Sequence, residues 1–117
     1  MVDYNLETGE VLKRCTTQGY SDESTWARGQ AWAIYGYTMC YRYTHSSTYL
    51  NQAKKVYEFI FTNSNLPKDL IPHWDFDALN IPNELMDASA ATIMASVLYE
   101  LSVFSNNKEY IKRLRIR

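Results

Sequence analysis

The chain has 117 residues, of which 46% are hydrophobic and 21% charged, and its formal net charge is −1. This length accommodates one domain at most, and the composition is that of a globular protein and not of a disordered segment. A charge so close to zero gives no electrostatic reason to expect a nucleic-acid partner, and no apolar run is long enough to span a membrane.

Residues 2–15 are predicted to form a β-hairpin ahead of the helices. Val2, Tyr4 and Leu6 alternate with polar residues, and the turn at 7–10 carries its glycine late, as hairpin turns often do. The alternation predicts two short strands joined by that turn.

The first helix is predicted from Ser24 to Thr44, after a polar loop over residues 15–22. Ser24 is the expected N-cap, because a serine hydroxyl accepts an amide hydrogen of the first turn. The helix is apolar or small on nearly every side, so we expect other elements to cover most of it. Gly29 and Gly36 each lower helix propensity by roughly 1 kcal/mol, and we expect them to let another backbone approach closely.

Three more helices are expected, from Ser47 to Thr62, from Asp87 or Ala88 to Phe104, and from about Asn107 to the chain end. The third helix is again apolar on most sides, whereas the second and fourth are amphipathic. The second helix has its apolar stripe at Leu50, Ala53, Val56, Tyr57 and Ile60.

The helices form two similar units, because Ala27 aligns with Ala88 and Tyr49 with Tyr110. Each unit pairs one helix that is apolar on most sides with one amphipathic helix, which indicates a helical-hairpin repeat. Apolar helices facing a centre and amphipathic helices facing water are typical of an α/α toroid. A simple solenoid is the competing architecture.

Ligand-binding chemistry is suggested by residues 18–32, which open the first helix with two tryptophans. Trp26 and Gln30 are four residues apart and share one helix face, and Arg28 and Trp32 share the adjacent face. An indole provides a flat plate for a sugar ring, and a guanidinium provides a forked donor for a carboxylate. The alternative is ordinary core packing, with Arg28 stacked on Trp32, the tryptophan four residues away.

The long loop over residues 63–85 is a second candidate region, because loops of this length inside compact domains are usually functional. Trp74, Asp75 and Asp77 are of the types that hold sugar hydroxyls. The alternative is a packed loop whose aspartates cap local turns.

Metal and disulfide chemistry are not indicated. Cys15 and Cys40 show neither metal-binding spacing nor a disulfide framework. His45 and His73 are far apart in the sequence, with no third ligand arranged around them. We therefore expect no metal site.

Residues 18–32 closely resemble a segment of the family 88 glycoside hydrolases, the unsaturated glucuronyl hydrolases. The segments 74–77 and 87–91, and the earlier 2–4 and 8–12, follow in register with motifs of that family, so the resemblance covers nearly the whole chain. It implies an all-α fold of helical hairpins, with the whole chain forming part of a six-hairpin (α/α)6 barrel.

The resemblance also implies an activity. Enzymes of this family remove unsaturated uronic acid from oligosaccharides that polysaccharide lyases produce. An aspartate protonates the C4=C5 double bond and activates water for C5, which differs from the two-carboxylate scheme at an anomeric carbon. No cofactor is implied, and the expected partners are unsaturated uronic-acid oligosaccharides, not nucleic acid or a membrane.

By resemblance, Gln18, Trp26, Arg28 and Trp32 are the substrate-binding residues, with the tryptophans stacking on sugar rings. Candidates for the rim of the cleft are Trp74, Asp75, Asp77 and Asp87. The catalytic aspartates of the family lie in its N-terminal half, so we expect no catalytic residue in this chain and an isolated chain that is inactive.

Two alternative functions remain open. One is part of an unsaturated rhamnogalacturonyl hydrolase, whose family usually differs around residues 29–31, and the other is a non-catalytic helical-repeat interaction module. Because two hairpins leave apolar helix faces bare, the chain is expected to associate with copies of itself. The expected location is the cytoplasm, or the periplasm if a signal precedes this sequence.

Overall fold

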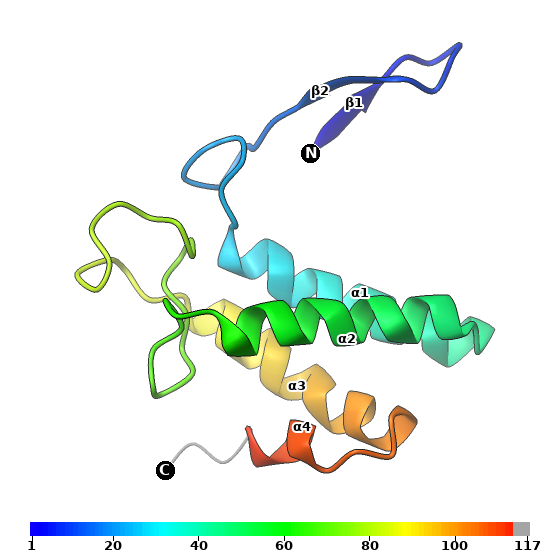
Figure 1. Ribbon diagram of the computed structural model, residues 1–117, viewed down its shortest axis with the longest axis vertical. Coiled ribbons are helices and arrows are strands. Elements are labelled where there is room, and N and C mark those ends of the chain that lie inside the picture. Colours follow the sequence, from blue (N-terminus) through cyan, green and yellow to red (C-terminus); the bar gives the residue numbers. More distant parts are fainter. Residues whose placement is uncertain (114–117) are drawn as a thin grey trace.

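The computed structural model describes residues 1–113, which form a β-hairpin followed by two helical hairpins (Figure 1). The order of these elements is the predicted one. Their bounds are β1 Val2–Tyr4, β2 Val11–Arg14, α1 Ala27–Thr44, α2 Ser47–Thr62, α3 Ala88–Phe104 and α4 Glu109–Lys112.

The predicted β-hairpin is present, with β1 and β2 antiparallel and Val2 paired with Arg14. Gly9 has a φ of 73°, a left-handed conformation that favours glycine, which explains its place late in the turn. Every residue of both strands is exposed, and Figure 1 shows the hairpin projecting away from the helices. The hairpin therefore adds little to the core.

The predicted start of the first helix was wrong, because α1 begins at Ala27 and not after Ser24. The Ser24 hydroxyl accepts the N–H of Ser21 and donates to Asp75, so it caps no helix. The intervening backbone pairs with the long loop, where the N–H of Phe76 donates to the carbonyl of Thr25 at 2.9 Å. This pairing holds residues 25–26 extended and delays the helix.

The expectation was also wrong for Gly29, the first of the two glycines of α1. A Cβ on Gly29 would meet the ring of Trp26 at 3.0 Å, so a side chain and not a backbone lies beside it. Trp26 directly precedes the helix, and its ring lies beside Gly29 in the first turn. At Gly36 a Cβ would meet nothing within 4 Å among the described residues.

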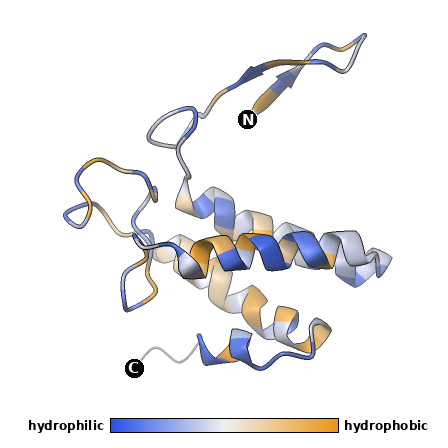
Figure 2. Ribbon diagram, in the orientation of Figure 1, coloured by the Kyte–Doolittle hydropathy of each residue, from blue (hydrophilic) through white to orange (hydrophobic). Residues whose placement is uncertain are grey.

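The two helical hairpins pack side by side around one core, with α1 in contact with both α2 and α3, and α4 against α3. Ala27 and Ala88 each begin a helix, so the predicted repeat is aligned in the structure. All five residues of the predicted α2 stripe belong to the core or pack against it. In Figure 2, α2 alternates between hydrophilic and hydrophobic, whereas α3 is mostly white to orange. The buried hydrophobic residues of the helices are Ala27, Ala31, Ile34, Leu50, Ala53, Ile60, Ala90, Met94, Val97, Leu98, Leu101 and Tyr110.

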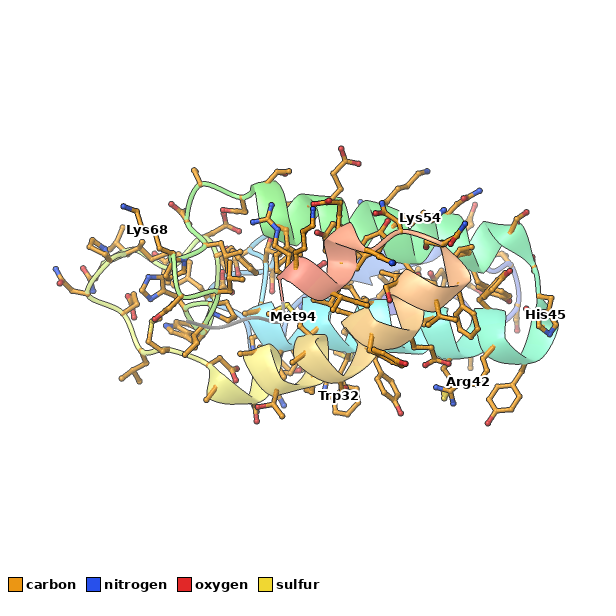
Figure 3. All side chains as sticks on the ribbon, turned by 90° about the horizontal axis from the view of Figure 1, so that it is seen from below. Trp32, Arg42, His45, Lys54, Lys68 and Met94 are labelled. Atoms are coloured by element: carbon orange, nitrogen blue, oxygen red, sulfur yellow. The ribbon has the colours of Figure 1, made fainter. Side chains whose placement is uncertain are left out.

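The helices α1 and α3 are buried on one face only, although their sequences are apolar on most sides. Trp32 is 51% exposed on α1, and Figure 3 shows it on the opposite side of the helical layer from Lys54. A depression of about 320 Å³ on α1 is lined by Ala33, Gly36, Tyr37, Met39 and Cys40. The expected cover on the second face is therefore not supplied within residues 1–113.

The molecule is a flat layer, with extents of 48 × 41 × 19 Å and a radius of gyration of 15.3 Å. A compact domain of this length has a radius of gyration of about 13 Å. Within the described residues, no helix is both long enough and apolar enough to cross a membrane.

The fourth helix begins two residues after its predicted start near Asn107. The side-chain oxygen of Asn107 accepts the N–H of Glu109, where α4 begins, and α4 is described as far as Lys112. The predicted continuation over residues 114–117 lies outside the described residues.

Candidate functional site

Arg28 is the second residue of α1. Its guanidinium lies 5.8 Å from the ring centre of Trp26. The core-packing alternative anticipated stacking on Trp32, four residues further along, so Arg28 stacks on the other tryptophan. The Arg28 side chain nevertheless remains 43% exposed, so it is not part of the core. Arg28 therefore both packs on an indole and faces solvent.

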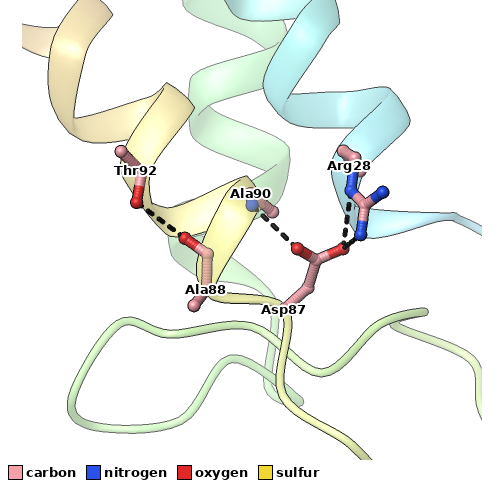
Figure 4. A network of polar contacts seen from close by, with 5 residues as sticks. All are labelled: Arg28, Asp87, Ala88, Ala90 and Thr92. Atoms are coloured by element: carbon pink, nitrogen blue, oxygen red, sulfur yellow. Dashed lines mark hydrogen bonds and ion pairs between the residues drawn. The ribbon is translucent and has the colours of Figure 1, made fainter.

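Arg28 also reaches Asp87, the residue that caps α3 (Figure 4). Asp87 Oδ2 accepts from Arg28 Nε at 3.1 Å and lies 3.0 Å from Nη2. Asp87 Oδ1 accepts the N–H of Ala90 at 2.9 Å, which satisfies a free amide of the first turn of α3. One carboxylate thus joins the starts of the two helices that contact each other in the core.

Arg28 and Asp87 line an open depression of about 320 Å³ together with Trp74. Three of the eight residues predicted for the substrate site are therefore brought together. The remaining lining residues are Leu85, Met86, Ala88 and Ser89. The depression combines a guanidinium, an indole and the exposed start of a helix, which suits a ring-shaped ligand that carries negative charge.

Trp74 is held in place by two residues that sequence reasoning missed. Its Nε1–H donates to Glu84 Oε2 at 2.9 Å, and the ring of Tyr20 packs edge-on at 6.5 Å. The hydrogen bond from Trp74, followed by one from the N–H of Asn80, lowers the pKa of Glu84 below its ordinary value. No local pattern pointed to either partner, because Glu84 is ten residues from Trp74 and Tyr20 is farther still.

Asp75 and Asp77 behave as the capping alternative predicted for this loop. Asp75 is fully buried, and its Oδ2 accepts from the N–H of Tyr20 and the hydroxyl of Ser24. Its Oδ1 accepts the N–H of Asp77, whose own side chain accepts the N–H of Thr25. The structure gives both aspartates a role in holding the loops, and a place at the rim of a cleft remains a prediction for them.

The other three predicted substrate-binding residues do not line this depression, and of these Trp26 reaches it only through its contact with Arg28. Trp32 lies one helical turn along α1 and packs edge-on against Tyr35, with ring centres 5.7 Å apart. Gln18 is exposed on the loop that Asp75 holds through Tyr20. Their roles in substrate binding stay predictions.

The chemistry of this site favours binding over proton transfer. Asp75 and Asp87 are both buried and both already accept hydrogen bonds through each oxygen. Across residues 1–113, no cluster of three metal-ligating side chains is found. The site therefore offers donors and aromatic surface, and its buried carboxylates act as supports.

Comparison with known proteins finds close relatives along nearly the whole chain, although no protein-family model matches it. An unsaturated glucuronyl hydrolase of Formosa agariphila is 50% identical over 111 residues, covering 95% of this chain and 28% of that protein. The crystal structure of an unsaturated glucuronyl hydrolase specific for heparin has a TM-score of 0.89 at 39% identity, over 97% of this chain and 32% of that one.

A further solved structure shows a ligand complex. It is a variant of unsaturated glucuronyl hydrolase from Streptococcus agalactiae complexed with dGlcA-GalNAc6S, with a TM-score of 0.70 and 32% identity. The match covers 95% of this chain and 30% of the Streptococcus agalactiae chain. The chain thus spans about 30% of the length of the proteins it matches.

Proposed function

The chain belongs to the unsaturated glucuronyl hydrolase family, and from this premise we propose that it forms one wall of the substrate cleft of such an enzyme. Its helical hairpins are part of the six-hairpin (α/α)6 barrel of that family. The observation that carries the proposal is the depression lined by Arg28, Trp74 and Asp87, in a chain 50% identical to a family member.

The proposed substrate is an unsaturated uronic-acid oligosaccharide of the kind that polysaccharide lyases release. Such a sugar offers a ring face, several hydroxyls and a carboxylate. Arg28 supplies a forked donor for an anionic group, and Trp26 supplies an aromatic plate next to it. We assign to Gln18 a further polar contact, and to Trp32 a second stacking surface.

The proposed reaction is hydration of the C4=C5 bond. A proton adds to C4 and the oxygen of a water molecule adds to C5. The resulting hemiketal opens to a C5 ketone and a hemiacetal at C1, and breakdown of that hemiacetal to an aldehyde releases the neighbouring sugar as an alcohol. We assign the proton transfer to aspartates of the N-terminal half of the enzyme, as the resemblance implies. Asp75 and Asp87 are instead engaged in support of the loops and helices. Residues 1–113 are proposed to bind and orient the substrate.

A segment exchange tests this function. The matching segment of the Formosa agariphila enzyme is replaced by this chain, and the hybrid is followed by the absorbance of the C4=C5 bond of an unsaturated chondroitin disaccharide. We expect turnover within about tenfold of the host, and a large loss in the same hybrid carrying Arg28→Ala. Lys54→Ala, on the opposite side of the layer from Trp32, is the matched control (Figure 3). A hybrid that melts cooperatively and turns over no substrate contradicts the proposal.

A further inference from the structure

We propose that Asp87 is a positioning residue for Arg28, holding the guanidinium so that the edge formed by Nη1 and Nη2 is the part offered to an anionic ligand. This inference rests on the proposed function of Arg28 as a ligand-binding residue. It concerns how this chain prepares that residue before any ligand arrives.

The carboxylate of Asp87 is itself rigidly placed. Only 3% of the side chain is exposed, and Oδ1 accepts the N–H of Ala90 at the start of α3. The positive end of the helix dipole favours the negative charge there. Rotation of the carboxylate toward another partner breaks the cap, so Oδ2 has a fixed position from which to hold Arg28 (Figure 4).

Asp87 occupies one side of the guanidinium. Oδ2 accepts from Nε at 3.1 Å and lies 3.0 Å from Nη2. A guanidinium has five N–H donors in a planar fork, so both donors on Nη1 and the outer one on Nη2 are left. The ring of Trp26, 5.8 Å from the guanidinium carbon, limits movement out of that plane.

The remaining edge has the geometry that carboxylates prefer. Two parallel N–H groups, one from each terminal nitrogen, match the two oxygens of a carboxylate in a bidentate pair. Arg28 lines the open depression with 43% of its side chain exposed, so these donors are the ones that a ligand can reach. Without Asp87, the Arg28 side chain samples more rotamers. Fixing one of them on binding then costs more conformational entropy, which weakens the pair between Arg28 and the ligand carboxylate.

The competing explanation is that Asp87 only caps α3. Serine separates the two roles, because it caps helices as well as aspartate does but is too short to reach Arg28. The variant Asp87→Ser therefore keeps α3 and releases the guanidinium. Asp87→Asn keeps the size and a capping oxygen but removes the charge that pairs with Arg28.

The experiment uses the full chain, labelled with ¹⁵N, and follows the Nε–H signals of arginine. The Arg28 signal is identified by its loss in Arg28→Lys, and sodium glucuronate is the ligand probe. We expect the Arg28 Nε–H to exchange with water about tenfold faster in Asp87→Ser and in Asp87→Asn than in the unmodified chain, the scale of one lost charge-assisted hydrogen bond. The affinity for glucuronate, measured from the shift of the Arg28 signal, falls about tenfold as well. Circular dichroism is expected to show unchanged helix content, because α3 stays folded.

Arg42 provides the matched control, because it also pairs through Nε and Nη2 with a carboxylate, that of Glu100, away from the depression. Glu100→Ser is expected to speed exchange at Arg42 and to leave Arg28 and glucuronate binding unchanged. An Arg28 signal that exchanges equally in the unmodified chain and Asp87→Ser overturns the proposal, as does a loss seen only together with the unfolding of α3. Protection that depends on Asp87 without any response to glucuronate upholds the positioning and contradicts the ligand role of Arg28.

Discussion

Tyr20 and Asp75 lie 55 positions apart in the sequence, yet the backbone N–H of Tyr20 donates to Asp75 Oδ2 at 2.9 Å. The same oxygen accepts from the hydroxyl of Ser24, and a Cβ on Gly19 would stand 3.2 Å from it. A single buried carboxylate thus ties the loop that carries Gln18 to the loop that carries Trp74.

Replacing this carboxylate is expected to destabilise the molecule. Asp75→Ala leaves the N–H groups of Tyr20 and Asp77 without their acceptor, and we expect the free energy of unfolding to fall by about 2–4 kcal/mol. Chemical denaturation followed by tryptophan fluorescence measures it. Asp3→Ala, on the exposed hairpin, is the control with an expected change below about 0.5 kcal/mol. Equal effects of the two substitutions would show that Asp75 supports nothing.

The pair formed by Trp74 and Glu84 predicts a pH dependence. The hydrogen bond from the indole lowers the pKa of Glu84, so the fold favours its ionised form. The stabilisation that ionised Glu84 contributes is complete when the pH is above 4.5, the ordinary pKa of a glutamate. It is lost as the pH falls below 4.5 toward the lowered pKa of Glu84 in the fold. Trp74 fluorescence should therefore be constant from pH 7 to pH 5 and change below pH 4.5. Glu84→Gln should remove that change, and a transition that survives in this variant belongs to another group.

The 117-residue chain by itself is expected to hydrate no unsaturated disaccharide. General acid catalysis is commonly worth about 10²–10⁴-fold, and we assign that role to none of its carboxylates. The assay follows the absorbance of the C4=C5 bond of an unsaturated chondroitin disaccharide at high protein concentration. Turnover that persists through several independent purification steps is the contrary result, and it would place the catalytic acid within this chain.

Loss of Arg28 should impair catalysis more than folding in an active enzyme that contains this sequence. A charge-assisted hydrogen bond contributes roughly 1.5–3 kcal/mol, so Arg28→Ala is expected to lower kcat/KM about 10- to 150-fold. Some loss of stability accompanies it, since Asp87 is buried and loses its charged partner. Kinetics and melting temperature are measured on one preparation. A fall in melting temperature with unchanged kcat/KM would assign Arg28 a structural role only.

Self-association is expected because the chain exposes more surface than a compact monomer does. Its accessible surface is 7893 Å², whereas a compact monomer of this mass exposes about 6,600 Å². Covering about 600 Å² of apolar surface contributes on the order of 15 kcal/mol, against association costs of about 4–15 kcal/mol. Light scattering after size exclusion, over a range of concentrations, measures the mass. Met39→Glu, in the depression on α1, should favour the monomer, and Lys54→Glu should not. A monodisperse, cooperatively melting monomer at high concentration would contradict the expectation.

The local parts of the fold were predictable from the sequence. The bounds of α2 and α3 agree with prediction, because the hydrophobic patterns that predict them lie within the segments themselves. The start of α1 was not predictable in this way. It depends on a bond between Ser24 and a carboxylate 51 positions later, and no local pattern reveals such a partner.

The contacts within the site depend on tertiary structure. Helical spacing pairs Arg28 with Trp32, whereas in the structure Arg28 stacks on Trp26, which lies before α1. The pairing of Arg28 with Asp87, 59 positions away, joins two elements whose relative placement is set by packing of α1 on α3. Glu84 and Tyr20 were missed for the same reason, since both reach Trp74 through the fold of the long loop.

The β-hairpin has a consequence for local unfolding. Its strands bury no side chain, so opening their ladder exposes almost no apolar surface, whereas opening α1 exposes the whole core. Amide hydrogens on β1 and β2 are therefore expected to exchange through openings of low free energy, and those of Ile34 and Leu98 only through global unfolding. The chain then has two tiers of stability, with the boundary between them at the loop that Asp75 secures.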